Sequence, residues 1–150
     1  FLVEARSTIF RQTMFSEFEE FTHETFEKGI PLTSQLLCKK YAELNKFYHG
    51  EKVEQLDEMQ YEWERIPHFY SHFYVYKYAT GMICAVNIAD KLLNDNENMV
   101  KKYKKFLSSG CTESPITLLR RCDCDLEKED IYDNVFSVCK DFIEKWKELI

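Results

Sequence analysis

The segment from Arg65 to Gly81 contains two histidines and four tyrosines, and one of these histidines and three of these tyrosines stand at spacings that suit catalysis. A proline sets a turn that presents His68, and a helix after the turn places Tyr74 and Tyr78 on one face, four residues apart. Tyr76 falls on roughly the opposite side of that helix. Histidine and tyrosine donate hydrogen bonds without a permanent negative charge. These side chains therefore suit a site where a carbonyl oxygen gains charge as water adds to it.

The same residues also fit a purely structural interpretation. In that interpretation the tyrosines are buried packing residues and His68 caps a turn. Aromatic residues make up 15% of the chain, with 12 Phe and 9 Tyr. Because large aromatic side chains fill cores as readily as they line peptide-binding clefts, this excess permits either interpretation.

The sequence lacks the motif that holds the metal in common helical zinc peptidases. In H-E-x-x-H, two His bind zinc and a Glu beside the first deprotonates the attacking water. His23 and Glu24 begin such a pattern, but Glu27 stands where the second His would be, so His23 is expected on a helix surface. Of the six cysteines only Cys122 and Cys124 are close, which does not predict a closed zinc site. We expect no metal ligands in this chain and free, mostly structural thiols.

Charge and hydropathy exclude several kinds of partner. The net charge is −6, whereas nucleic acid and anionic membranes require a basic surface. No stretch reaches the ~18 apolar residues that span a bilayer, and the start of the chain lacks the features of a signal peptide. We therefore expect a cytoplasmic protein that binds neither nucleic acid nor membrane. The start at Phe1, without a Met, fits an internal piece of a longer protein.

Helical periodicity runs through almost the whole chain, which has only four Gly and three Pro. The sequence predicts an all-α fold and one compact helical unit over residues 1–150. Helices are expected at Phe1–Lys28, Leu56–Glu64, Phe73–Leu93, Glu97–Leu107 and Ile131–Leu149. Another is expected between an N-cap at Thr33 and a helix end at Gly50. A short helix is expected after Ser114-Pro115, followed by a left-handed residue at Asp123.

Four stretches, in order along nearly the whole chain, resemble the C-terminal part of oligoendopeptidase F. They are RQTMFSEFE at 11–19, the segment 29–50 with PLT and YAELNKFYHG, YEWERIPHFYSHFYVYKYATG at 61–81, and FLSSGCTESPITLLRRCDCDL at 106–126. The resemblance implies the multi-helix C-terminal portion of a zincin-like helical peptidase catalytic domain without its zinc-binding helix. It also implies a cytosolic zinc endopeptidase that hydrolyses short peptides, with its zinc ligands and catalytic Glu upstream of Phe1.

The resemblance also implies roles for the residues of the Arg65–Gly81 segment. In this family, and in the wider group related to thimet oligopeptidase, a His and tyrosines downstream of the zinc motif bind the substrate backbone and the tetrahedral intermediate. The matching positions are His68 and the tyrosines of FYVYKY. Tyr78 is favoured for the oxyanion role, because a His followed ten residues later by Tyr is similar to the related enzymes; Tyr74 ranks second and Tyr76 third. The implied partners are short peptide substrates and the remainder of the same peptidase chain.

Two loops depart from the family pattern. Gly110-Cys111-Thr112 stands where the family usually has a Gly-Gly-Ser type loop, and the segment 122–125 replaces Ala-Gly-Val-Asp. A side chain at Cys111 is expected to narrow or stiffen a loop near the substrate.

The alternative to an enzyme is a non-catalytic helical module that kept the peptidase scaffold. Such a module would bind peptides or partner helices through its aromatic cleft. An intact H-E-x-x-H upstream of Phe1 favours the enzyme, and its loss favours the binding module.

Overall fold

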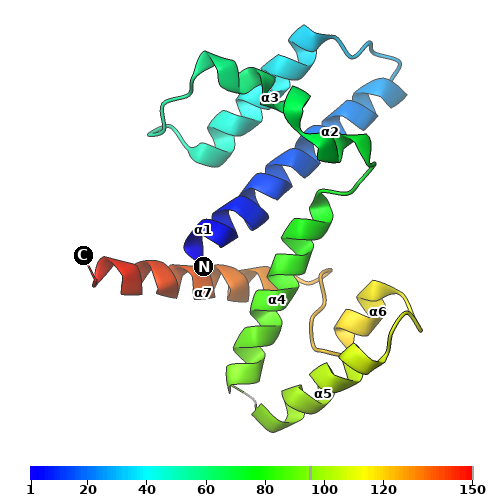
Figure 1. Ribbon diagram of the computed structural model, residues 1–150, viewed down its shortest axis with the longest axis vertical. Helices are drawn as coiled ribbons and strands as arrows, with labels where there is room; N and C mark the ends of the chain where they lie inside the picture. Colours follow the sequence, from blue (N-terminus) through cyan, green and yellow to red (C-terminus); the bar gives the residue numbers. More distant parts are fainter. Residues whose placement is uncertain (95, 150) are drawn as a thin grey trace. The chain divides into compact units, whose positions relative to one another are not determined.

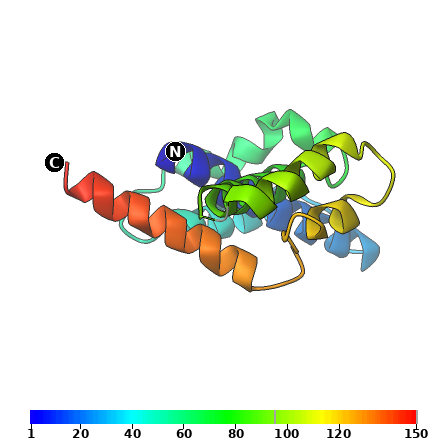
Figure 2. The same cartoon turned by 90° about the horizontal axis from the view of Figure 1, so that it is seen from below.

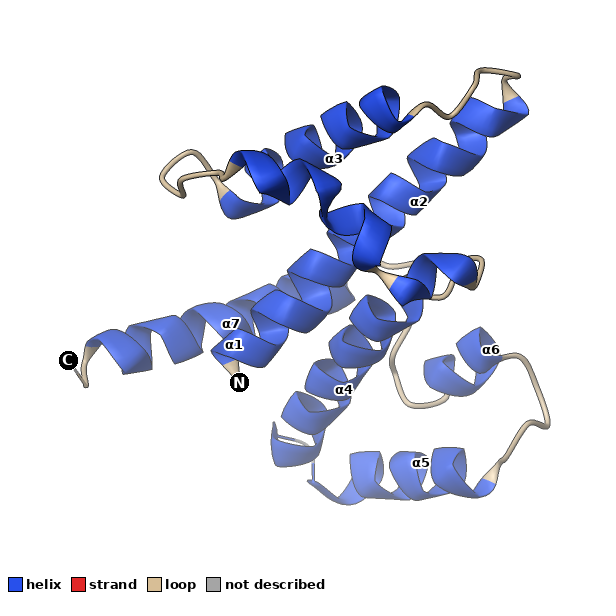
Figure 3. Cartoon of the chain, turned by 45° about the horizontal axis from the view of Figure 1, so that its top comes forward, coloured by secondary structure: helices blue, strands red, loops and turns tan. Residues whose placement is uncertain are grey.

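The computed structural model describes residues 1–94 and 96–149, apart from the side chain of residue 96. Over these residues the chain is all-α, as predicted, and forms no strand (Figures 1 and 3). The α-helices are α1 (Leu2–Ala5), α2 (Arg11–Glu27), α3 (Ser34–His49), α4 (Tyr76–Asn94), α5 (Asn96–Ser108), α6 (Pro115–Arg120) and α7 (Asp130–Lys147). A π-helical segment, η1 (Arg6–Phe10), lies between α1 and α2, and two 3-10 helices, η2 (Asp57–Arg65) and η3 (Pro67–Tyr70), precede α4. No helix in the described part of the chain is long and apolar enough to cross a membrane.

The contacts of the chain group into two compact units. Unit 1 combines Phe1–Ala5 with the chain from Thr80 to the C-terminal end, and unit 2 is Arg6–Ala79. The histidine and the three tyrosines predicted for the site all belong to unit 2. That residues 1–150 act as one unit stays a prediction.

Local sequence signals set the helix ends of unit 2. The Thr33 hydroxyl accepts a hydrogen bond from the Leu36 amide at 3.2 Å and caps α3, as predicted. Gly29 and Gly50 follow α2 and α3 with φ of 73° and 77°, a left-handed backbone that glycine adopts without steric cost. The acidic segment predicted at Leu56–Glu64 is helical as η2, with the tighter 3-10 geometry.

Unit 2 closes around an aromatic hydrophobic core. Helix α2 turns back through a short loop into α3, and η2 packs against α3 (Figure 1). The buried members of the core are Met14, Phe15, Phe18, Leu37, Tyr41, Leu44, Ile66 and Val75. Ile66 and Val75 come from the two ends of the segment 66–75, so both ends of this segment are fixed in one core.

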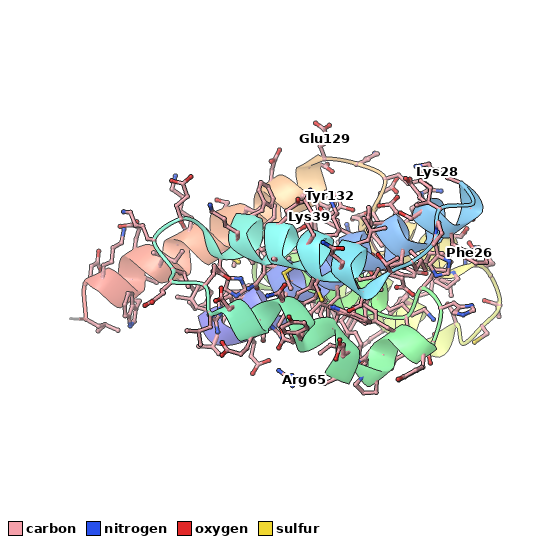
Figure 4. The ribbon with its side chains drawn as sticks, turned by 90° about the horizontal axis from the view of Figure 1, so that it is seen from above. Phe26, Lys28, Lys39, Arg65, Glu129 and Tyr132 are labelled. Carbon is pink, nitrogen blue, oxygen red and sulfur yellow. The ribbon has the colours of Figure 1, made fainter. Side chains whose placement is uncertain are left out.

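A buried carboxylate at Glu62 ties η2 to the helices beneath it. Its side chain accepts hydrogen bonds from Arg11 of α2 at 2.6 Å and from the Tyr41 hydroxyl of α3 at 2.7 Å. Arg65 adds a third bond from its exposed side chain, which extends from η2 in Figure 4. Burial raises the pKa of Glu62, but the bonds from Arg11 and Tyr41 outweigh it, and the pKa lies below its usual value. The carboxylate is therefore ionised and joins three elements.

Replacing Tyr41 by Phe should destabilise the fold, because it removes a fully buried donor to this carboxylate. We expect a loss of about 1.5–3 kcal/mol in the free energy of unfolding, the usual range for a hydrogen bond to a charged group. Tyr48→Phe is the matched control, since the Tyr48 hydroxyl donates to Glu17 in an exposed bond. Its expected cost is within about 0.5 kcal/mol. Equal losses for the two variants, measured by thermal or denaturant unfolding, would contradict this account of Glu62.

Unit 1 has its own core and its own capping residues. Ser114 caps α6 by accepting from the Thr117 amide at 3.3 Å, and Asp123 is left-handed with φ of 53°, both as predicted. The Asp123 carboxylate accepts a hydrogen bond from Lys102, and its carbonyl accepts one from Lys91. Helix α7 continues unbroken to Lys147 (Figure 2). The buried apolar residues of this unit are Ala5, Ile83, Cys84, Val86, Ile88, Met99, Leu118, Cys122, Cys124, Ile131, Val135 and Cys139.

All six cysteines are free thiols, as predicted. Five of them are buried, and the sixth, Cys111, is exposed in the loop before α6. The buried thiols therefore behave as small apolar core residues.

Candidate functional site

Three of the predicted site residues meet in one cluster on unit 2. The His68 ring stacks on Tyr74 with centroids 5.8 Å apart and an interplanar angle of 16°. Tyr78 meets both rings edge-on, at 5.7 Å from His68 and 5.3 Å from Tyr74. The Tyr78 hydroxyl donates a hydrogen bond to the Tyr74 hydroxyl at 3.0 Å. The structure thus brings an imidazole and two phenols together, and we call these three residues the His–Tyr cluster.

The His–Tyr cluster is positioned by buried neighbours in the same segment. Ile66 and Val75 are buried in the core of unit 2, and Phe69 packs against that core from η3. Phe69 makes edge-on and tilted contacts with Phe15 and Phe18 at 5.6 and 5.5 Å. Because these apolar side chains point inward, the residues between them are directed outward.

The exposure of the tyrosines bears on the structural interpretation of this segment. Tyr74, Tyr76 and Tyr78 are 38%, 44% and 37% exposed in this chain, and His68 is partly exposed. The three tyrosines are therefore not buried within this chain, and the roles of the tyrosines and of His68 stay predictions. The packing role belongs instead to Phe69 and Val75 of the same segment.

Tyr74 lies two residues before the helix in which it was expected. Helix α4 begins at Tyr76, three residues later than the predicted start at Phe73. A hydrogen-bonded turn precedes it, with the Lys77 amide bonded to the Tyr74 carbonyl at 3.3 Å and the Tyr78 amide to the Val75 carbonyl at 3.1 Å. The late start has a local cause, because Phe73 is left-handed with φ of 51°, and a right-handed helix cannot include such a residue.

Tyr76 occupies the first position of α4, two residues before Tyr78. Two residues in a helix correspond to about 200° of rotation, so Tyr76 and Tyr78 start from nearly opposite sides of α4. The ring contacts described above join His68 with Tyr74 and Tyr78. This arrangement favours Tyr74 and Tyr78 over Tyr76 as a pair that acts with His68.

The hydroxyl pair leaves one phenol proton available. Tyr78 uses its proton in the bond to Tyr74, and this bond raises the pKa of Tyr78 above its usual value. Accepting that bond makes the Tyr74 hydroxyl a stronger donor through cooperative polarisation. The pair can therefore offer the polarised O–H of Tyr74 to an external oxygen.

Two residues of α2 contact the turn before α4, and no sequence motif predicts these contacts. The buried Glu19 of α2 accepts a hydrogen bond from the Phe73 amide at 2.6 Å through its carboxylate oxygen Oε1. His23 stacks on the Phe73 ring at 4.6 Å and meets His72 edge-on at 5.5 Å. His23 is thus a partly exposed residue of α2, covered on one side by a neighbouring turn. The i, i+4 spacing of Glu19 and His23 on one helix face is the only local signal for this contact.

No group of three or more His, Cys, Asp or Glu side chains that could hold a metal ion occurs in residues 1–94 and 96–149. The described residues therefore do not fit a zinc site, and the His–Tyr cluster has to act without metal ligands of its own. Its side chains can donate hydrogen bonds to an oxygen atom that carries or gains negative charge.

The fold and the cluster define an all-helical protein with an exposed hydrogen-bonding site. Comparison with known proteins gives its family. The chain belongs to peptidase family M3, whose family model matches residues 2–138.

Several relatives in this family are similar to nearly the whole chain. Oligopeptidase PepF of Bacillus subtilis (strain 168) is 40% identical over 144 residues, which are 96% of this chain and 21% of the relative. The plasmid-encoded oligoendopeptidase F of Lactococcus lactis subsp. cremoris is 37% identical over 145 residues, 97% of this chain and 24% of the relative. The chain therefore spans between a fifth and a quarter of the length of these relatives.

A solved structure shows the same fold. The crystal structure of oligoendopeptidase-F from Enterococcus faecium superimposes with a TM-score of 0.92 at 37% identity, and covers 96% of this chain and 28% of that one. A putative peptidase from Chlamydophila abortus superimposes with a TM-score of 0.88 at 36% identity, over 96% of this chain and 24% of that one. The sequence resemblance to oligoendopeptidase F is thus confirmed.

Removing the acceptor of the Tyr78 hydrogen bond should lower the pKa of Tyr78. In the Tyr74→Phe variant we expect the pKa to fall toward about 10, because the proton of Tyr78 no longer has a phenol partner. Tyrosinate absorbance checks this in a difference titration between each protein and the same protein carrying Tyr78→Phe, which isolates the phenol at position 78. The same pKa for Tyr78 with and without the Tyr74 hydroxyl would contradict a hydrogen bond between the two phenols.

Proposed function

We propose that this chain is the substrate-binding part of a zinc-dependent oligoendopeptidase that hydrolyses short peptides. Membership of peptidase family M3 supports the peptidase activity. The zinc and its ligands belong, in this proposal, to the remainder of the same peptidase chain, since the described residues offer no metal-binding group. A cytoplasmic location remains part of the same prediction.

Within that enzyme, we assign the His–Tyr cluster to the carbonyl oxygen of the peptide bond that is cleaved. The single observation that carries this assignment is the contact of His68 with a bonded pair of phenols, Tyr74 and Tyr78, in an exposed position. When water adds to the carbonyl, its oxygen gains negative charge and binds donors more tightly than the ground state does. The cluster stabilises that oxygen by hydrogen bonding, and it orients the peptide backbone beforehand.

Tyr78→Phe in the full-length protein should lower kcat by roughly a hundredfold, the usual cost of disabling an oxyanion donor, because it removes the phenol whose hydrogen bond polarises the Tyr74 hydroxyl. KM and zinc content should change little, because the phenol acts on the transition state and binds no metal. Hydrolysis of a quenched fluorescent peptide, together with metal analysis, provides the measurement. Tyr70→Phe is the matched control, since Tyr70 lies in the same segment and is 85% exposed. We expect wild-type kinetics for that variant.

Two further variants rank the tyrosines. Tyr74→Phe should impair kcat as well, because it removes the phenol proton that the hydroxyl pair offers to the oxygen, whereas Tyr76→Phe should have the smaller effect. Wild-type kcat for Tyr78→Phe with a strong loss for Tyr76→Phe would move the oxyanion role to Tyr76. Peptide binding without hydrolysis by the full-length protein would instead favour the non-catalytic binding module.

A further inference from the structure

Glu19 is a buried carboxylate whose hydrogen bond spans a long stretch of chain. It is 5% exposed, and its Oε1 atom accepts the Phe73 amide across a separation of 54 residues at 2.6 Å. A buried carboxylate is costly unless a partner compensates for the water it has lost. Its bond to Phe73 provides such compensation, and it ties helix α2 to the turn that precedes α4.

Phe73 adopts a backbone conformation that a bulky residue rarely takes. Its φ of 51° is left-handed, which is an outlier for an aromatic side chain and persists only where the surroundings impose it. Two contacts from α2 impose it here. Glu19 fixes the amide, and His23, one helical turn later, stacks on the ring at 4.6 Å with an interplanar angle of 29°.

The conformation of Phe73 sets the direction of the residues after it. Tyr74 follows immediately, Val75 is fully buried, and the turn bonds from Lys77 and Tyr78 start helix α4. A change of φ at Phe73 would swing Tyr74 away from its stacking position on His68. The Tyr74–Tyr78 hydroxyl pair therefore depends on the Phe73 turn.

We propose that Glu19 is a positioning residue for the Tyr74–Tyr78 hydroxyl pair, acting through the backbone amide of Phe73. This inference rests on the proposed function, because it assigns Glu19 to the same reaction. Glu19 touches no reacting atom. Its carboxylate oxygen holds the Phe73 turn left-handed, and the turn holds the two phenols in register with His68. The role requires an acceptor atom at the right reach and does not require negative charge.

Three substitutions at position 19 of the full-length enzyme test this role. Glu19→Gln keeps a carbonyl oxygen at the same reach, so we expect kcat within about threefold of wild type. Glu19→Asp keeps the charge but shortens the side chain by one methylene, and Glu19→Met keeps the length without an acceptor. Both should lower kcat by roughly tenfold or more while KM changes less. A displacement of a catalytic group by about 1 Å is enough to lower the rate by this factor. The control is Glu20→Met on the exposed side of α2, which should retain wild-type kinetics.

A double-mutant cycle separates positioning from a general loss of structure. If Glu19 acts through the hydroxyl pair, Glu19→Asp combined with Tyr78→Phe should lower kcat little more than Tyr78→Phe alone. The Asp and Gln variants keep the test decisive if the Met variant fails to fold. A multiplicative combination, wild-type kcat for Glu19→Asp, or an equal loss for Glu19→Gln and Glu19→Asp would each overturn the proposal.

The failure of this inference is distinguishable from failure of the proposed function. If Tyr78→Phe impairs kcat and Glu19→Asp does not, the inference alone is wrong. If Tyr78→Phe retains wild-type kcat, the proposed role of the cluster fails, and the inference that depends on it is overturned as well.

Discussion

Ile66 and Val75 are buried in the same hydrophobic core, and the geometry of the segment between them follows from that double anchoring. A segment fixed at both ends has few ways to arrange its remaining side chains. With Phe69 also packed inward, His68 and Tyr74 are left on the outside, where Tyr78 reaches them from the first turn of α4. Burial of apolar side chains thus supplies the free energy that holds an exposed polar cluster in place.

Two buried carboxylates complete this scaffold by hydrogen bonding. Glu62 joins η2 to α2 and α3 just before the anchored segment, and Glu19 joins α2 to the turn just after it. Both are ionisable groups within a largely apolar unit, and each has partners that offset its burial. A buried group with fixed partners tolerates fewer alternative arrangements than an apolar contact does. We infer that these carboxylates restrict the segment to one conformation, while the aromatic core supplies most of its stability.

Much of this arrangement could be predicted from local sequence signals. Thr33, Gly50, Ser114 and Asp123 set helix ends through short-range steric and hydrogen-bonding rules, and all four do so in the structure. The four-residue spacing of Tyr74 and Tyr78 indicated that their side chains meet, and they do. Tyr74 lies in the turn before α4 and Tyr78 in the first turn of α4, and their rings still make contact because the turn has nearly helical spacing.

Other features had no local signal. An aromatic residue type does not predict a left-handed backbone conformation. Phe73 adopts one because Glu19 and His23 contact it from a helix more than 45 residues away in sequence. The sequence does not distinguish Glu62 from the other acidic residues of its helix, although Glu62 is buried and hydrogen-bonded to Arg11, 51 residues away. The π-helical geometry of Arg6–Phe10 and the grouping of contacts into two units likewise depend on packing rather than on local propensity.

In the proposed function, the His–Tyr cluster binds the transition state of peptide hydrolysis more tightly than it binds the substrate. The most direct test compares the full-length enzyme with its Tyr78→Phe variant in binding two ligands, a phosphinic peptide that mimics the tetrahedral intermediate and an uncleaved substrate-like peptide. We expect the substitution to weaken binding of the phosphinic peptide by roughly the same factor as it lowers kcat/KM, and to leave binding of the substrate-like peptide nearly unchanged. Equally weakened binding of both ligands, or unchanged binding of both, would contradict this role of the His–Tyr cluster.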